Sequence, residues 1–257
     1  MIQSIDPAAC TGCGSCTKTC PLDVFRLETA QEQISPCMAA CPAGVDIRGN
    51  HYLIQQGNLD EAARNYLAVQ PFPAITGRVC FHPCESACAR ARVDSAVNIN
   101  AVEHVLGDWA AQMPLEKPVR RHISKVAVVG SGPAGLTCAS DLAKKGYDVT
   151  VFEALHLAGG VLVYGIPEFR LPKAIVQKEV DGLKALGVKV ETNMVIGRVV
   201  SIDELMSEYG FEAVFIGSGA GLPMFMHIPG ENLCGVYSAN EFLTRINLMK
   251  AYKDGSD

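Results

Sequence analysis

Two kinds of hydrophobic spacing divide this chain of 257 residues. Across residues 36 to about 118 the apolar positions recur at the intervals of amphipathic helices, whereas from Lys125 onward short apolar runs alternate with helical stretches. Between the two patterns, "MPLEKPVRRHISK" (113–125) has two prolines and mixed charge, which is typical of a linker. We therefore predict a mainly helical domain over 36–118 and an α/β domain over 119–257, preceded by a short head over 1–35.

Two segments of the helical domain have a single apolar face. Asn58, followed three residues later by Glu61, has the spacing of a capping box that opens a helix. The apolar face of that helix consists of Leu59, Ala62, Ala63, Tyr66 and Leu67. The two prolines of "QPFPAITG" (70–77) end it, and a second helix is predicted over 99–113. One side of the second helix carries Val102, Val105, Leu106 and Trp109.

Composition narrows the classes of function. The net charge is -5, from 22 basic and 27 acidic residues, and no block of lysine or arginine suggests a nucleic-acid interface. No apolar run approaches the ~20 residues that a membrane-spanning helix needs. The opening "MIQSIDPAAC" has neither the basic nor the apolar region of a signal peptide. We therefore expect a cytoplasmic protein that inserts in no membrane and binds no nucleic acid.

Eleven cysteines change the picture, because nine of them fall in closely spaced groups within the first 88 residues. The head contains "CTGCGSCTKTCP", the C-x2-C-x2-C-x3-C-P spacing of bacterial ferredoxins. In ferredoxins that hold two clusters, the cysteine before proline binds a different cluster from the first three. The head is thus predicted to be ferredoxin-like and to provide the cluster ligands Cys10, Cys13, Cys16 and Cys20.

A second group of cysteines follows in the helical domain. Cys37 and Cys41 keep the C-x3-C-P ending of a ferredoxin motif, but Gln31 and Ile34 stand where its two earlier cysteines belong. The remaining members of the group are Cys80, Cys84 and Cys88. Zinc sites usually consist of paired C-x2-4-C knuckles, which this arrangement matches poorly, and a reducing compartment disfavours disulfides. Nine cysteines suffice for two [4Fe-4S] clusters with one thiolate to spare. Cys138 and Cys234 stand apart and are interpreted as small buried hydrophobes.

The α/β domain begins with a dinucleotide-binding fingerprint. In "KVAVVGSGPAGLTCASDLAKKGYDVTVFE" (125–153) an apolar strand leads into Gly130-x-Gly132-x-x-Gly135, a helix follows, and a second strand ends at Glu153. The first glycine permits the tight turn, the second admits the pyrophosphate, and the third lets helix and strand pack closely. The acid can accept a ribose hydroxyl. This pattern predicts a Rossmann-type fold that binds a dinucleotide, and so FAD and not FMN if the cofactor is a flavin, but the fingerprint alone does not distinguish FAD from NAD.

Two later segments point to the same site. Paired glycines and a Gly-Ile-Pro turn in "GGVLVYGIPEFRLPK" (159–173) suggest backbone lying close to a planar ligand. The strand in "FEAVFIGSGAG" (211–221) ends in small residues, among them Gly219, and returns the chain to the crevice at the carboxyl edge of the sheet.

Together, "PCMAACPAGVDI", "GRVCFHPCESAC", "VAVVGSGPAGL", "FEALHLAGGVLVYGIPEFRLPK" and "AVFIGSGAGLP" resemble the glutamate synthase small-subunit family. The chain is equally similar to the FAD subunit of bifurcating ferredoxin:NADP oxidoreductases and to the N-terminal part of dihydropyrimidine dehydrogenase. The resemblance runs from about Ser35 to about Lys250 and implies a helical domain with two [4Fe-4S] clusters, followed by an FAD domain.

The resemblance also implies how the ligands divide. Cys41, Cys80 and Cys84 would share one cluster with a non-cysteine ligand, which falls here on Glu103. The alternative is that Glu103 only caps its helix, since Asn100 and Glu103 have capping-box spacing. The other cluster would take Cys37 and Cys88, but the family's two further cysteines correspond here to Thr29 and Glu32. We expect the head to supply the missing thiolates.

For the flavin, the resemblance assigns the glycine turn and Glu153 to the pyrophosphate and adenosine ribose. It places Gly160, Val161 and Arg170 in contact with FAD, and the stretch from Tyr164 to Pro167 near the isoalloxazine. The predicted cofactor-binding residues are therefore Gly130, Ser131, Gly132, Pro133, Ala134, Gly135, Glu153, Gly160, Val161, Tyr164, Arg170 and Gly219.

Members of the family continue into a second Rossmann domain for NADPH, whereas this sequence has one complete fingerprint. Either another polypeptide supplies the rest, or the chain is truncated or naturally split. We expect redox partner subunits, one with an NAD(P)-binding domain, and ferredoxin is a candidate partner. The leading hypothesis is an oxidoreductase subunit that passes electrons between FAD and [4Fe-4S] clusters. The alternatives are a non-catalytic wiring and docking subunit with a vestigial flavin fold, and a zinc-stabilised scaffold.

Overall fold

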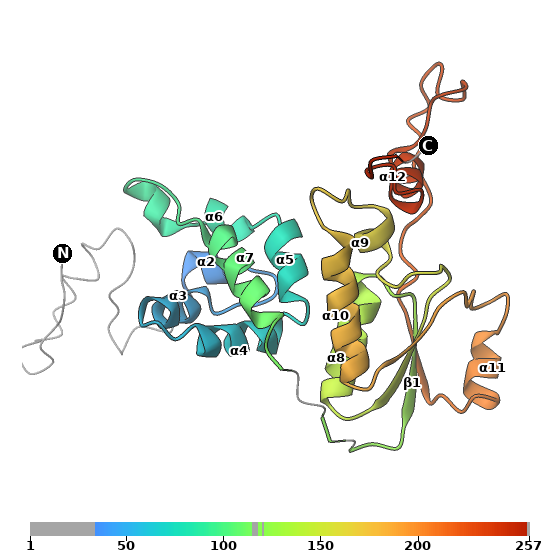
Figure 1. The fold of residues 1–257 in the computed structure, drawn as a ribbon, viewed down its shortest axis with the longest axis horizontal. Helices are drawn as coiled ribbons and strands as arrows, with labels where there is room; N and C mark the ends of the chain where they lie inside the picture. Colours follow the sequence, from blue (N-terminus) through green and yellow to red (C-terminus); the bar gives the residue numbers. More distant parts are fainter. Residues whose placement is uncertain (1–33, 115–117, 120, 256–257) are drawn as a thin grey trace, which may run out of the picture.

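The computed structural model describes residues 34–114, 118–119 and 121–255. The predicted head ligands Cys10, Cys13, Cys16 and Cys20, and the positions Thr29 and Glu32, lie outside the described residues. The described chain forms a helical part and an α/β part that lie side by side (Figure 1). The division into domains at residues 35 and 118 stays a prediction.

The helical part is built from short helices around one apolar core. The bounds are α2 (Pro36–Ala39), α3 (Ile47–Gln55), α4 (Leu59–Val69), α5 (Pro73–Val79), α6 (Pro83–Ser86), the 3-10 turn η1 (Ala89–Arg92) and α7 (Ile99–Ala110). Proline begins α2, α5 and α6, where its missing N–H costs nothing. The buried core consists of Val45, Ile47, Ala62, Ala63, Tyr66, Cys84, Ile99, Leu106 and Ala110.

Helices α5 and α7 cross with their backbones in contact. A Cβ atom added at Gly77 would lie 2.8 Å from the Cα of His104, and one added at Gly107 would lie 2.4 Å from the carbonyl oxygen of Pro73. No larger residue fits at either position without moving a backbone. The crossing therefore sets the place of the cysteine that follows α5.

The capping box predicted at Asn58 and Glu61 does not form, and neither does the alternative box of Asn100 and Glu103. Asn58 precedes α4 but its side chain makes no capping hydrogen bond. Helix α7 is capped by Asn98, whose side chain accepts from the backbone N–H of Ala101 at 3.3 Å. Asn100 lies inside α7 and donates its backbone N–H to Glu85, so it forms no box with Glu103. The predicted apolar side of this helix is also partly wrong, since Val105 and Trp109 are exposed.

The α/β part contains a four-stranded sheet in the order β3-β2-β1-β4, with every pair parallel. Its strands are β1 (Lys125–Val129), β2 (Asp148–Phe152), β3 (Lys189–Glu191) and β4 (Ala213–Ile216). Helices α8 (Pro133–Lys144) and α10 (Lys173–Ala185) lie between the sheet and the helical part, and α11 (Ile202–Ser207) lies on the far side (Figure 1). The remaining helices are α9 (Val161–Tyr164) and α12 (Ala239–Leu248).

Side chains of the central strands alternate between the two faces of the sheet, as the pleat requires. Val128 and Val151 join the core beneath α8 and α10, whereas Ala127 and Phe152 join a smaller core with Leu205 of α11. Burial on both faces explains why β1 and β2 are short continuous apolar runs.

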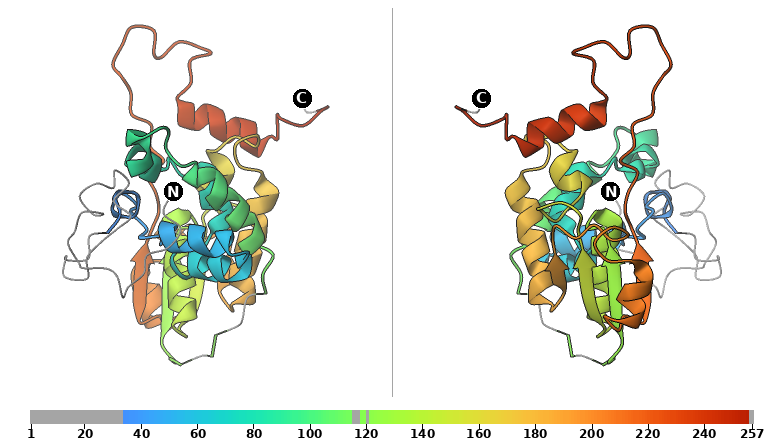
Figure 2. Two further views of the ribbon diagram at one scale, coloured as in Figure 1. Left: turned by 90° about the vertical axis from the view of Figure 1, so that its left-hand side faces the viewer. Right: turned by 90° about the vertical axis from the view of Figure 1, so that its right-hand side faces the viewer.

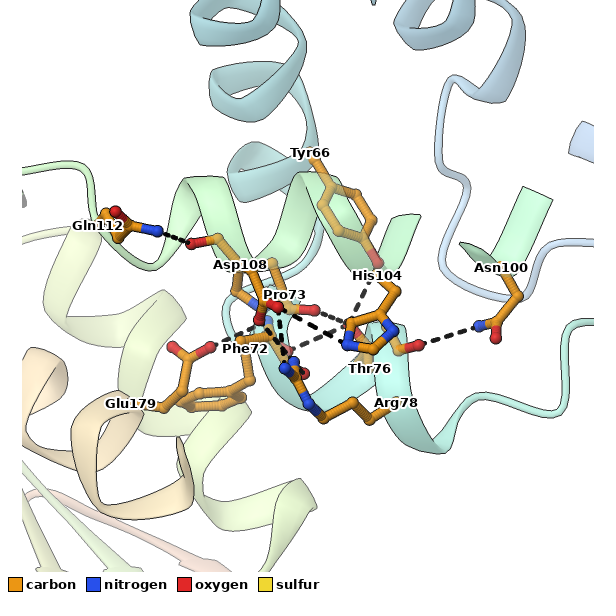
Figure 3. Close-up of polar contacts among 12 residues, drawn as sticks. Tyr66, Phe72, Pro73, Thr76, Arg78, Asn100, His104, Asp108, Gln112 and Glu179 are labelled. Atoms are coloured by element: carbon orange, nitrogen blue, oxygen red, sulfur yellow. Dashed lines mark hydrogen bonds and ion pairs between the residues drawn. The ribbon is translucent and has the colours of Figure 1, made fainter. Parts of the chain in front are cut away.

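The helical part packs directly onto the α/β part. Phe72 and Ile75 belong to the same core cluster as α8 and α10. Across this contact, Glu179 Oε1 of α10 accepts the backbone N–H of Ala74 at 3.0 Å, as Figure 3 shows, and Lys144 Nζ donates to Leu67 O at 3.2 Å. Helix α5 thus begins at the α/β part and ends at Val79, directly before Cys80.

After β4, the chain runs through an extended and exposed segment to α12, which projects from the sheet (Figure 2). Leu222 and Met224 of this segment are 91% and 95% exposed. Within the residues that the structure describes, no helix is both long and apolar enough to cross a membrane.

Candidate functional site

The glycine turn after β1 has three glycines in three different surroundings. Gly130 has φ +97°, and a Cβ there would meet Gly217 O at 2.4 Å; at Gly135 it would meet Gly130 O at 1.9 Å. Nothing lies within 4 Å of a Cβ built at Gly132. The first and third glycines therefore permit the turn and the packing of α8, while Gly132 leaves open space at the N-terminus of that helix.

That open space belongs to a cavity of about 720 Å³ at the carboxyl edge of the sheet. The predicted residues that line it are Gly130, Ser131, Gly132, Pro133, Ala134, Glu153, Gly160, Val161, Tyr164 and Gly219. Gly135 packs behind the turn and is buried. Arg170 is exposed and is not among the residues that line the cavity. The structure thus brings together residues from four separate stretches of sequence.

Glu153 organises the floor of the cavity. Its Oε2 atom accepts the backbone N–H of Ser131 at 3.0 Å and also the Ser131 hydroxyl, and its Oε1 atom accepts the N–H of Leu155 at 2.9 Å. Ser131 Oγ in turn accepts the N–H of Gly159 at 2.9 Å. Both Glu153 and Ser131 are buried, at 6% and 0% exposed. The sequence analysis missed this network, because nothing in the sequence shows that Ser131 contacts Gly159.

The facing wall comes from residues 159–165. Gly160 has φ +52°, and a Cβ there would lie 2.8 Å from Gly132 Cα, so the two loops touch through backbone. Tyr164 is buried; its hydroxyl accepts the N–H of Leu157 at 3.0 Å and lies 3.2 Å from His156 Nδ1. Its ring meets the His156 imidazole edge to face.

Helix α12 and the loop after β3 complete the cavity with residues that the sequence analysis missed. These are Met194, Val195, Ile196, Asn240 and Thr244. The spacing of Asn240 and Thr244, on one face of a predicted helix, is the signal that could have indicated them.

These residues fit a dinucleotide. The volume lies within the usual range of cofactor pockets. The N–H groups at the start of α8 face a space left free of side chains, which is the arrangement that binds a pyrophosphate. The Glu153 oxygens, although bonded to the protein, keep lone pairs that can accept ribose hydroxyls.

A second group of chemically active side chains surrounds Tyr66 in the helical part. Burial raises the pKa of the Cys84 thiol to about 11, and the nearby charges of Glu103, Cys80 and Cys41 act in the same direction. Burial also raises the pKa of Tyr66, with further contributions from Glu103, Cys80 and Cys41. Cys41, Cys80 and Glu103 thus lie close enough to act on the pKa values of both Cys84 and Tyr66, and their role as ligands of one cluster stays a prediction.

Glu103 faces this group and does not cap its helix. Burial raises the pKa of its carboxyl, and the Tyr66 hydroxyl acts in the opposite direction by hydrogen bonding. The Cys80 sulfur accepts the N–H of His82 at 3.3 Å. His82 itself has a left-handed backbone conformation, with φ +43°. Hydrogen bonds from backbone amides to sulfur are typical of thiolates that hold a cluster.

Cys37 and Cys88 lie apart from that group and line a separate cavity of about 670 Å³ against α3. Cys88 Sγ accepts the N–H of Val97 at 3.4 Å, and Cys37 Sγ lies 3.4 Å from the Ser35 hydroxyl. Two thiolates are half of a four-ligand set. Among the described residues, no group of three His, Cys, Asp or Glu side chains is placed to hold a single metal ion.

The two isolated cysteines differ from each other. Cys138 is half-buried and packs against the core of the α/β part. Cys234 is exposed in the segment before α12, so its interpretation as a buried hydrophobe is wrong. The seven described cysteines are all free thiols.

Family models match three regions of the chain. Residues 30–115 match dihydropyrimidine dehydrogenase domain II, 4Fe-4S cluster, and residues 124–251 match pyridine nucleotide-disulphide oxidoreductase. Residues 4–26 match a 4Fe-4S binding domain. The first match ends, and the second begins, within the predicted linker (113–125). The match at 4–26 contains the four head cysteines.

Three curated relatives illustrate the similarity. NADPH-Fe(3+) oxidoreductase subunit beta of Geobacter sulfurreducens is 37% identical over 82% of this chain and 32% of its own length. NADP(+)-dependent formate dehydrogenase subunit beta of Moorella thermoacetica is 34% identical, over 83% and 34%. The small chain of glutamate synthase [NADPH] of Bacillus subtilis is 36% identical, over 90% and 50%.

The chain thus spans between about a third and a half of the length of these relatives. The resemblance predicted from the motifs is confirmed by the family models and by these homologues. This chain is a homologue of the glutamate synthase small chain and of related oxidoreductase beta subunits, and it joins a 4Fe-4S region to a pyridine nucleotide-disulphide oxidoreductase region.

Proposed function

We propose that the chain is the flavin and iron-sulfur part of a multi-subunit oxidoreductase and passes electrons between FAD and two [4Fe-4S] clusters. One observation carries this proposal. Helix α5 begins against α10 of the α/β part, where Glu179 accepts the Ala74 N–H, and ends at Val79, directly before Cys80. A single rigid element therefore joins the cavity-bearing part to the predicted cluster ligands.

In this proposal the FAD pyrophosphate lies over Gly132 at the N-terminus of α8, and Glu153 accepts the ribose hydroxyls. Cys41, Cys80, Cys84 and Glu103 hold one cluster. Cys37 and Cys88 belong to the second cluster, whose other ligands come from the head cysteines. When bound, the flavin supplies two-electron chemistry and the clusters accept and release single electrons. The protein holds these groups and tunes them through burial and through N–H groups aimed at sulfur.

The domain division of the proposal is a ferredoxin-like head (1–35), a helical cluster domain (36–118) and a Rossmann-type FAD domain (119–257). Nucleotide reduction or oxidation then requires an NAD(P)-binding unit, which a partner subunit or a further part of a longer protein supplies. Ferredoxin is a second candidate partner. NADPH appears in the names of the Geobacter and Bacillus relatives, which supports a nicotinamide as the hydride source.

Optical spectra of the purified chain test the proposal. A flavin band that survives desalting, with iron and acid-labile sulfide in equal amounts, is the expected result. Clusters without flavin would favour the wiring and docking alternative instead. Zinc without iron or sulfide would favour the scaffold.

A substitution at the glycine turn makes the flavin test specific. Gly132→Val should abolish FAD binding, because the new side chain occupies the space kept open for the pyrophosphate and its backbone conformation (φ -67°) suits any residue. Ala174→Val, at an exposed site on α10, is the matched control and should keep its flavin. Full FAD occupancy in the Gly132 variant would contradict the assignment.

A further inference from the structure

The wall of the cavity begins at residues 159–165 and continues as one segment to residue 172, and the backbone hydrogen bonds within this segment join only residues three to five positions apart. It contains α9, a helix of one turn, and just after this helix the N–H groups of Gly165 and Ile166 both donate to the carbonyl of Val161. Short helices leave carbonyl groups without partners. In this wall, the carbonyls of Leu162, Tyr164, Ile166 and Leu171 are bound by side chains from outside it.

Lys173 binds three of these carbonyls. Its Nζ atom donates to Leu162 O at 3.2 Å, to Leu171 O at 3.1 Å and to Ile166 O. An ammonium group has three N–H donors, so all of them are used on one segment. The backbone N–H of Lys173 also donates to Glu168 Oε2 at 3.0 Å. One residue thus ties together four positions of the wall between Leu162 and Leu171.

Asn247 binds the fourth carbonyl from α12. Its Nδ2 atom donates to Tyr164 O at 3.0 Å and to Leu243 O at 2.9 Å, and the residue is 7% exposed. The same helix places Asn240 and Thr244 at the cavity. The bond to Tyr164 therefore holds both the wall and the helix that completes the cavity.

The Lys173 ammonium also places a positive charge behind the wall. Burial lowers the pKa of this group, and Glu168 raises it. The partners within hydrogen-bond reach of Nζ are backbone carbonyls, and the nearby Glu168 carboxylate offsets only part of the positive charge. A cation near a bound flavin favours its reduced and more negative state, and so raises the reduction potential.

We propose that Lys173 and Asn247 are positioning residues, which hold the wall in the shape that binds the flavin, and that the Lys173 charge sets the flavin's reduction potential. Neither residue lines the cavity, so both act through the backbone of residues 159–172. This inference rests on the proposed binding of FAD to the chain.

The test compares FAD affinity and flavin midpoint potential in Lys173→Met, Lys173→Arg and Asn247→Leu. Loss of a charge-assisted hydrogen bond predicts a rise of about tenfold or more in the FAD dissociation constant for Lys173→Met. Its flavin potential should also fall, whereas Lys173→Arg should keep a potential close to that of the unaltered chain. Asn247→Leu should weaken FAD binding with a smaller change in potential, because no charge is removed.

Lys184→Met on α10 and Arg245→Met on α12 are the matched controls. Both side chains are exposed and pair with carboxylates on their own helices. Cluster absorbance and melting temperature show whether each variant is folded. If Lys173→Met does not fold, Lys173→Arg and Asn247→Leu carry the test.

Three results would overturn the inference. FAD affinities within twofold of the unaltered chain in the Lys173 and Asn247 variants would remove the positioning role. Equal potentials in the Met and Arg variants would remove the role of charge. If the unaltered chain binds no FAD, the proposed function fails first and the inference falls with it, so the two failures are distinguishable.

Discussion

At the scale of single residues, Glu103 is the proposed cluster ligand that a substitution can test. Because Asn98 caps α7, the carboxyl of Glu103 is free to face Cys84 and Tyr66. Glu103→Ala should therefore remove or convert one cluster, which the electron paramagnetic resonance spectrum of the reduced protein will show. Asn98→Ala is the control: it should cost about 1 kcal/mol of stability and leave the cluster signals unchanged. Unchanged spectra in the Glu103 variant would exclude the carboxyl as a ligand.

The same residues show where sequence reasoning succeeds and where it stops. Asn58, Asn98 and Asn100 all stand near a helix start, and only the backbone conformation before the helix decides which one caps it. Gly130, Gly132 and Gly135 were predictable because their spacing is local. Asn247 was not, since it meets Tyr164 across 83 positions of sequence.

At the scale of elements, the contact between α5 and α10 depends on the charge of Glu179. Burial raises the pKa of this carboxyl from 4.5 to about 7, against the hydrogen bond from Ala74 and the positive charges of Lys178 and Arg78, while Asp108 adds to the rise. Ionised Glu179 therefore costs free energy in the folded state. The free energy of unfolding should fall as the pH rises from about 4.5 to 7, by an amount on the order of 3 kcal/mol.

Glu179→Gln should remove this dependence. The difference in melting temperature between pH 5 and pH 8 is expected to be smaller in the variant than in the unaltered chain. The variant should also be the more stable protein at pH 8. Glu208→Gln, at an exposed site after α11, is the control and should follow the unaltered chain at both pH values. A Glu179 variant with the same pH dependence as the unaltered chain would argue against an interface controlled by this carboxyl.

The order of elements in the α/β part was predictable, because a strand, a glycine turn and a helix follow one another within 125–153. Their assembly with the helical part was not. Phe72 and Ile75 lie in a stretch that sequence indicated only as a helix end, yet they enter the core beneath α8 and α10. Apolar periodicity shows that a face will be buried, but not which partner covers it.

At the scale of the whole molecule, the number of clusters is the quantity to measure. Two [4Fe-4S] clusters correspond to about eight irons per chain, from the ligand arithmetic and the two-cluster pattern of ferredoxin motifs. Iron and sulfide assays of the anaerobically purified chain should give this value. A result near four would leave Cys37 and Cys88 without a cluster. A result near twelve would require ligands from a partner or from other side chains.

The crossing of α5 and α7 has a consequence for how this protein can evolve. Cys80 comes three residues after Gly77, and the position of Gly77 is determined by backbone touching backbone instead of by the fit of side chains. Apolar residues around the crossing can therefore be exchanged in the course of evolution while Cys80 keeps its place. A single methyl group at Gly77 or Gly107 would instead push the two backbones apart and displace Cys80. The contact between the two backbones therefore permits substitutions in the surrounding core and forbids them at these two glycines.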